Sequence, residues 1–162
     1  MEKASCCCFT GHRILKVTDE LEKSLRSVLV GLIENGVFDY FAGGALGWDM
    51  LCEETVIELK KQYEVRLHLV LPCSVGELTT KWVYARKDRF DRILCSADSV
   101  TILSDNYYDG CMRERNTYLV EHCGQCVCCF NEKHSRSGTA QTVRMAKKNG
   151  LNVINLFDQQ GY

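Results

Sequence analysis

Three short segments of the chain combine residue types that suit a phosphate group. They are Thr10-Gly11-His12-Arg13, Gly43-Gly44-Ala45-Leu46-Gly47-Trp48-Asp49 and Ser137-Gly138-Thr139. An arginine offers paired donors to phosphate, and glycine lets backbone amides approach an anion closely. Tight turns and helix caps use the same residue types, so a purely structural role stays open for each segment. Together the three segments predict a site for a phosphate-bearing ligand.

Further candidates lie elsewhere in the chain. Arg115 and Asn116 fall near the start of a predicted helix, where the helix dipole disfavours a cation unless an acid or an anion neutralises it. Trp82 is a candidate for stacking on a base, with the packing of the core as the alternative. Asp105 follows an apolar run and adds a carboxylate to the candidate site.

The hydrophobic periodicity predicts strands that alternate with helices and a final strand. This order predicts an α/β fold: a Rossmann-like, open, mostly parallel sheet with helices on both faces. In such a sheet, ligands bind beyond the carboxyl ends of the strands, so we expect the loops after strands one, two, four and five to converge there. The expected strands are 5–9, 38–42, 65–71, 99–103, 126–130 and 152–156, and the expected helices begin near 18, 49, 80, 111 and 139.

The length and composition favour one domain over residues 1–162. Twenty Lys and Arg residues nearly balance 21 Asp and Glu residues, which argues against nucleic acid as a partner. The chain shows neither a signal peptide nor an apolar run of about 18 residues, so we expect a cytoplasmic protein without a membrane partner. The sequence predicts no cofactor.

The eleven cysteines raise the alternatives of a metal or a redox site. Cys123 and Cys126 form a Cys-x-x-Cys pair, and His134 follows nearby. A structural zinc site usually takes two such pairs, and the other cysteines are scattered through apparent core strands. We therefore expect reduced thiols and no metal site, and a Cys/His zinc or redox site around 123–134 stays the alternative.

Taken together, the motifs resemble the YpsA-like branch of the SMF/DprA/LOG (SLOG) superfamily. The resemblance rests on the first two segments above, Pro72, Trp82, Arg115-Asn116 and 137–143, and it spans nearly the whole chain. It implies a Rossmann-like fold, often a homodimer, that binds a nucleotide or a nucleotide-like small molecule through two glycine loops. Relatives include N-glycoside hydrolases of nucleoside monophosphates, sensors of nucleotide-derived signals and proteins that bind single-stranded DNA.

The hydrolase motif of the superfamily ends in a glutamate that serves catalysis, and Thr142 stands at that position here. Threonine cannot replace a carboxylate as a general base. The first hypothesis is therefore a binding or sensing domain, in which Arg13 and the loop amides hold phosphate while Thr10 and Asp49 contact sugar hydroxyls. The alternative is a phosphoribohydrolase whose acid comes from Asp49, Glu53 or Asp105. The resemblance assigns no catalytic residue.

Overall fold

The computed structural model describes residues 1–157, so the last five residues of the predicted domain lie outside the described part. Within residues 1–157, six strands form one parallel sheet in the order β4-β3-β2-β1-β5-β6. The strands are β1 (Cys6–Gly11), β2 (Asp39–Ala42), β3 (Arg66–Leu71), β4 (Ser99–Ile102), β5 (Gln125–Cys129) and β6 (Asn152–Asn155). The helices are η1 (Lys3–Ser5), α1 (Asp19–Glu34), α2 (Trp48–Leu59), α3 (Val75–Thr79), α4 (Tyr84–Ser96), α5 (Cys111–His122) and α6 (Gly138–Lys148).

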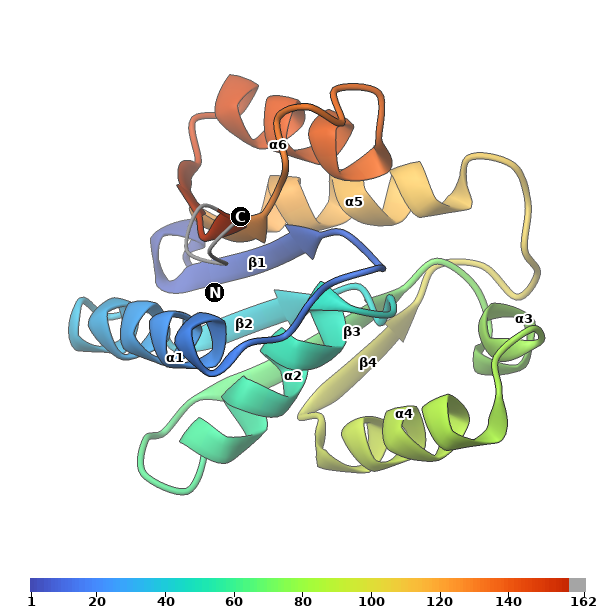
Figure 1. Ribbon diagram of the computed structural model, residues 1–162, viewed down its shortest axis with the longest axis horizontal. Coiled ribbons are helices and arrows are strands. Elements are labelled where there is room, and N and C mark those ends of the chain that lie inside the picture. Colours follow the sequence, from blue (N-terminus) through green and yellow to red (C-terminus); the bar gives the residue numbers. More distant parts are fainter. Residues whose placement is uncertain (158–162) are drawn as a thin grey trace.

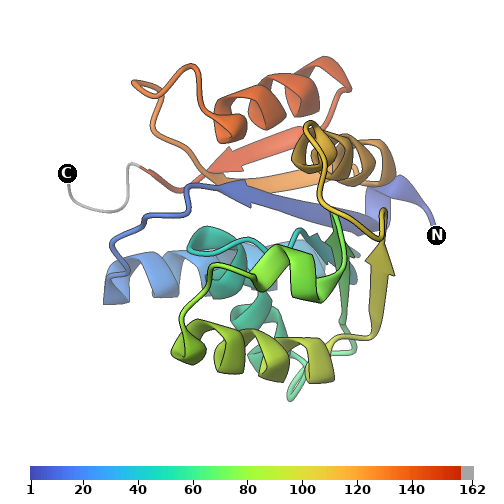
Figure 2. The ribbon, with the colours of Figure 1, turned by 90° about the vertical axis from the view of Figure 1, so that its right-hand side faces the viewer.

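Helices cover both faces of the sheet, as the sequence predicts for this fold class (Figure 1). Helices α5 and α6 lie on one face, and α1, α2 and α4 lie on the other; the turned view shows the same three layers (Figure 2). The central strands β1, β2 and β5 are almost wholly buried, which explains their near-continuous apolar sequences. The prediction of a Rossmann-like α/β sheet is confirmed.

One predicted helix differs from the structure. The helix expected from about residue 80 begins at Tyr84 as α4, after extended backbone at Val83. A short helix that the periodicity does not predict, α3, precedes it. Ser74 starts α3 early, because its hydroxyl accepts a hydrogen bond from the Glu77 amide at 3.4 Å. Periodicity alone does not reveal this break, because the apolar residues of both helices pack against the same core. Across residues 1–157, no helix has the length and apolarity needed to span a membrane.

The strand order determines where a ligand site forms. From β1 the chain runs through β2 and β3 to the edge strand β4, and then returns to place β5 on the other side of β1. The loops that leave β1 and β5 therefore diverge from neighbouring strands, which opens a crevice beyond their carboxyl ends. The register places Gly11 at the end of β1 beside Cys129 at the end of β5.

Candidate ligand-binding site

A cleft of about 1200 Å³ lies beyond the carboxyl ends of β1 and β5. Its walls come from the loop after β1, the start of α2, one side of α5, the loop after β5 and the first turn of α6. Most of the residues that the sequence predicts for the site line this cleft. They are Thr10, Gly11, His12, Arg13, Asp49, Arg115, Asn116, Ser137, Gly138 and Thr139.

The segment 43–49, here called the first glycine loop, has two amides that are already hydrogen-bonded within the protein. Gly44 donates its N–H to Oε1 of Glu53 at 3.1 Å, and Ala45 donates to Oδ2 of Asp49 at 3.2 Å. Both carboxyls come from α2, which follows the loop directly. These two amides consequently do not face an external anion, unlike the arrangement that the sequence predicts for this loop.

Gly47 serves the packing of two loops. Its φ of +76° and the tight space around it suit glycine, since a Cβ here would lie 2.3 Å from the backbone oxygen of Arg13. The next amide, that of Trp48, donates to the backbone oxygen of His12 at 3.2 Å. Gly47 therefore holds the loop after β1 against the start of α2, and this contact shapes one wall of the cleft.

Gly43 makes room for a buried arginine. A Cβ at Gly43 would lie 2.3 Å from Nη1 of Arg115, and this guanidinium donates to the carbonyl oxygen of Gly43. Nε of Arg115 donates to Oδ1 of Asn116 at 2.7 Å. Only 5% of Arg115 is exposed, although it lines the cleft. The Arg115-Asn116 pair and the first glycine loop thus form one structural unit.

Two buried acids share the surroundings of Arg115. Burial raises the pKa of Asp49, although the positive charge of Arg115 and the amides of Ala45 and Gly43 oppose this shift. Burial and the nearby Asp49 raise the pKa of Glu53 well above its usual range. Within the described residues, Oε2 of Glu53 is buried without a hydrogen-bond partner. Arg115, with a smaller contribution from Arg13 at Asp49, therefore supplies the positive charge that opposes these shifts.

The first turn of α6 offers the amides that the first glycine loop does not. Ser137 caps the helix, since its Oγ accepts a hydrogen bond from the Ala140 amide at 3.1 Å. Gly138 and Thr139 occupy the first turn, where helix amides have no partner within the helix. The position of a Cβ at Gly138 has no neighbouring atom within 4 Å. Backbone amides with open space in front of them suit an anion.

Two histidines lie on the same side of the cleft as α6. Nε2 of His12 accepts a hydrogen bond from the Asn131 amide at 3.0 Å, so the proton of the neutral ring sits on Nδ1. The rings of His12 and His134 lie 5.4 Å apart. Burial, together with His134, lowers the pKa of His12. A neutral His12 is thus a hydrogen-bond donor through Nδ1.

The loop after the fifth strand was expected at the site, but residues 131–134 were not among the predicted site residues. Asn131, Glu132, Lys133 and His134 line the cleft, as do Lys16 and Phe130. The signal that identifies them is positional: they follow β5, the strand beside β1 at the point where the order of strands reverses. Lys16 and Lys133 add cationic side chains to the cleft.

Other predicted site residues lie elsewhere. Trp82 packs edge-on against Phe90 at 5.3 Å and borders a smaller hollow of about 50 Å³, which shares Arg13 and Arg115 with the main cleft. Asp105 is exposed and lines neither hollow, because it follows the edge strand β4, three strands away from β1. The four loops do not all converge on one place.

The Cys-x-x-Cys pair and His134 are also separated. Cys123 and Cys126 are buried beside Cys8, near the start of β5, whereas His134 lies beyond the end of that strand. Among residues 1–157, His, Cys, Asp and Glu side chains form no group of three or more that could hold a metal ion.

The fold is that of a Rossmann-like domain, and its cleft lies at the switch point of the sheet. Comparison with known proteins identifies the family: the sequence profile of the YspA SLOG family matches residues 10–158, and the chain belongs to this family. It is similar to a UPF0398 protein of Brevibacillus brevis, with 26% identity over 88% of this chain and 76% of that protein. A UPF0398 protein of Macrococcus caseolyticus is 28% identical over 70% of this chain and 62% of its own length.

The fold is also that of DNA processing protein A from Helicobacter pylori, with a TM-score of 0.65 and 16% identity. The match covers 94% of this chain and 65% of that one, whose published description concerns a single-stranded DNA binding mode. The prediction that argued against nucleic acid as a partner is therefore wrong, because it used the net charge of the whole chain. A near-neutral total does not describe the local charge of a cleft. The oligomeric state stays a prediction.

Proposed function

We propose that this protein binds a nucleotide or a nucleotide-derived phosphate compound in the cleft beyond β1 and β5. The first turn of α6 carries the proposal: Ser137, Gly138 and Thr139 line the cleft, and the Cβ position of Gly138 is open space. The phosphate would accept hydrogen bonds from the amides of Gly138 and Thr139, as at other helix N-termini.

The charges and apolar surfaces around the cleft support the same ligand class. Arg13, Lys16 and Lys133 line it, and His12 offers its Nδ1–H. Phe130 provides an aromatic ring in the same cleft, 6.2 Å from the ring of His12. A volume of about 1200 Å³ accommodates a base and a sugar together with their phosphates. In this proposal, the first turn of α6 binds the phosphate and the first glycine loop does not.

Thermal denaturation with a panel of ligands tests the proposal. The panel contains ADP-ribose, mononucleotides, dinucleotides and cyclic nucleotides, with ribose and free bases as controls without phosphate. A ligand at 100 times its Kd adds about 2.7 kcal/mol of stability, which raises the Tm by about 5–10 °C for a chain of this size. If no phosphate compound moves the Tm more than the controls do, the proposal is wrong.

Short single-stranded DNA forms a second arm of the same experiment. An oligonucleotide that contacts the protein through several phosphates loses affinity steeply as the salt concentration rises. The affinity of a single bound mononucleotide depends on salt far less. Measuring Kd at two salt concentrations therefore distinguishes a nucleotide pocket from a strand-binding surface. Stabilisation by oligonucleotides alone would contradict a site for a small ligand.

A second candidate, hydrolysis of an N-glycosidic bond, rests on Asp49. This carboxyl lines the cleft, and burial raises its pKa, which favours the protonated form that a general acid needs. Thr142, which stands at the glutamate position of the hydrolase motif, is buried and donates its hydroxyl proton to the Gly138 carbonyl at 3.0 Å. Release of base from nucleoside monophosphates, measured by chromatography, tests the candidate. Activity that Asp49→Asn leaves unchanged would remove its physical basis.

A further inference from the structure

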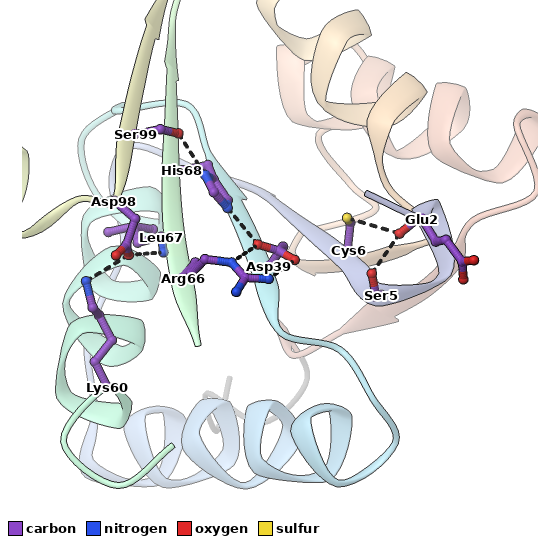
Figure 3. A network of polar contacts seen from close by, with 10 residues as sticks. All are labelled: Glu2, Ser5, Cys6, Asp39, Lys60, Arg66, Leu67, His68, Asp98 and Ser99. Atoms are coloured by element: carbon purple, nitrogen blue, oxygen red, sulfur yellow. Dashed lines mark hydrogen bonds and ion pairs between the residues drawn. The ribbon is translucent and has the colours of Figure 1, made fainter. Parts of the chain in front are cut away.

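A row of hydrogen-bonded polar side chains lies at the rim of the sheet opposite the cleft, near the amino ends of β2, β3 and β4. Oγ of Ser99 lies 2.7 Å from Nδ1 of His68, and Nε2 of His68 lies 2.8 Å from Oδ1 of Asp39 (Figure 3). His68 and Ser99 are register partners on neighbouring strands. The three side chains thus form a continuous Ser-His-Asp relay.

The surroundings of Asp39 determine where the protons sit. Arg66 donates to both carboxylate oxygens of Asp39, at 2.7 and 2.8 Å. Arg66 and His68 hold the pKa of Asp39 below its usual value, so this carboxylate only accepts hydrogen bonds. Nε2 of His68 must then carry the proton, and Nδ1 presents its lone pair to the hydroxyl of Ser99. A neutral histidine in this tautomer is a base for that hydroxyl.

The relay is held in place while its serine stays accessible. Asp98, directly before Ser99, accepts hydrogen bonds at 2.8 Å from the Leu67 amide and from Nζ of Lys60 (Figure 3). The ring of His68 stacks on Phe41 with centroids 4.7 Å apart. Asp39 is 2% exposed and His68 is 9% exposed, whereas Ser99 is an exposed residue. The base is therefore buried, and its serine partner is an exposed residue of the edge strand.

The edge position of β4 provides a donor beside the hydroxyl. The Asp98 amide donates to the Leu67 carbonyl at 2.8 Å, on the side of β3. Successive amides of a strand point to opposite sides, so the amide of Ser99 points to the open side of the edge strand. An oxyanion formed next to Oγ of Ser99 has this N–H within reach, as in other acyl-transfer sites.

We infer that Ser99 is a nucleophile toward acyl esters, with His68 as its base and Asp39 as the group that orients the base. The Ser99 oxygen bonds to the ester carbonyl carbon while its proton passes to Nδ1 of His68. The ester C–O bond then breaks, and the alcohol leaves with that proton. Water, activated by the same nitrogen, hydrolyses the acyl-serine and restores the relay. Ser99 lies on the edge strand β4 and outside the large cleft, so the expected substrates are small esters without a long acyl chain.

Labelling with a fluorophosphonate tests this inference, because the reagent phosphonylates activated serines and releases fluoride. We expect one adduct, located at Ser99 by peptide mapping and absent from Ser99→Ala. His68→Gln should slow the labelling at least about 100-fold, since a positioned base contributes roughly 10²–10⁴-fold. Ser104→Ala is the matched control: its hydroxyl donates to the backbone of Asn106, and its loss should leave the rate unchanged.

Thermal denaturation shows whether each variant folds. If His68→Gln does not fold, Asp39→Asn replaces it, because an amide no longer fixes the proton on Nε2 and the labelling rate should fall. Absence of an adduct on the wild-type protein, or wild-type labelling of a folded His68 or Asp39 variant, would overturn the inference. The nucleotide site lies at the other rim, so Ser99→Ala should leave any nucleotide-induced rise in Tm unchanged.

Discussion

Buried acids lie at both rims of the sheet, and their pKa values are shifted in opposite directions. The carboxyl rim is the edge at the carboxyl ends of the strands, beside the cleft, and the amino rim is the edge at their amino ends, where Asp39 lies. At the carboxyl rim, Asp49 and Glu53 lie near Arg115 without a direct ion pair, and their pKa values are raised by burial. At the amino rim, Asp39 is paired with both Arg66 and His68, and its pKa is lowered. Glu53 has one carboxyl oxygen without a hydrogen-bond partner, whereas both carboxyl oxygens of Asp39 have partners. Burial therefore dominates at the first acid, and charge pairing dominates at the second.

The largest expected effect comes from removing the cation of the carboxyl rim. Arg115→Met leaves two buried acids without their nearest positive charge and the Gly43 carbonyl without its donor, so we expect the free energy of unfolding to fall by about 2–3 kcal/mol. Denaturant unfolding measures this loss. Arg113→Met, an exposed arginine on the same helix, is the control and should change stability by less than about 0.5 kcal/mol. Equal effects of the two substitutions would contradict the role given to Arg115.

The second effect concerns binding rather than stability. Gly138→Ala adds a methyl group to the wall of the cleft at the first turn of α6, so we expect nucleotide affinity to fall at least about tenfold, or about 1.4 kcal/mol. The Tm should stay the same or rise slightly, because alanine suits this helical backbone better than glycine. Gly31→Ala in α1 also has open space and is the control. Calorimetric titration that finds unchanged affinity would remove α6 from the proposed phosphate site.

The third effect is a pH dependence at the carboxyl rim. The pKa of Glu53 in the folded state lies well above its ordinary value of 4.5, so over this window the folded protein holds a proton that the unfolded chain releases. Stability therefore falls as pH rises from about 4.5, by up to about 1.4 kcal/mol per pH unit for one proton. Glu53→Gln should flatten this slope and keep an oxygen acceptor for the Gly44 amide. Glu58→Gln, exposed on the same helix, should leave the slope unchanged.

The smallest effect, with the opposite sign, is expected at the amino rim. The pKa of Asp39 is lowered from 3.8, so its contribution to stability is present above that pH and is lost as pH falls through the folded value. Asp39→Asn should lower stability at neutral pH by about 1 kcal/mol, because its partner Arg66 is half exposed. Urea unfolding between pH 2 and 7 should show a smaller loss of stability at low pH for Asp39→Asn than for the wild-type protein. Asp91→Asn, an exposed residue of α4, is the control.

Much of the fold was predictable because its signals are local. Strands such as β1 and β5 are continuous apolar runs, and α1 carries a stripe of apolar residues every three or four positions. The short helix α3 and the exact start of α4 were missed because they depend on a capping serine, Ser74, and on one extended residue, Val83. Boundaries of this kind depend on single hydrogen bonds rather than on periodicity.

The candidate site was predictable only in part. His12, Arg13 and Ser137-Gly138-Thr139 could be placed at a strand end or a helix start, and they do line the cleft. The partner of the Gly44 amide could not be foreseen, because Glu53 reaches it from the second turn of α2. The distance of Asp105 from the cleft follows from the position of β4 at the edge of the sheet.

The sequence by itself determined the alternation of strands and helices, the family and the order of the loops that carry polar residues. The tertiary structure alone decided which of those loops meet, because strand order is not written in local periodicity. It also decided which amides donate hydrogen bonds within the protein. The amides of Gly44 and Ala45 do so because carboxyl groups of α2 fold back to accept from them. The contact of Ser99, His68 and Asp39, which lie about 30 residues apart in the chain, exists only because parallel strands bring distant residues into register.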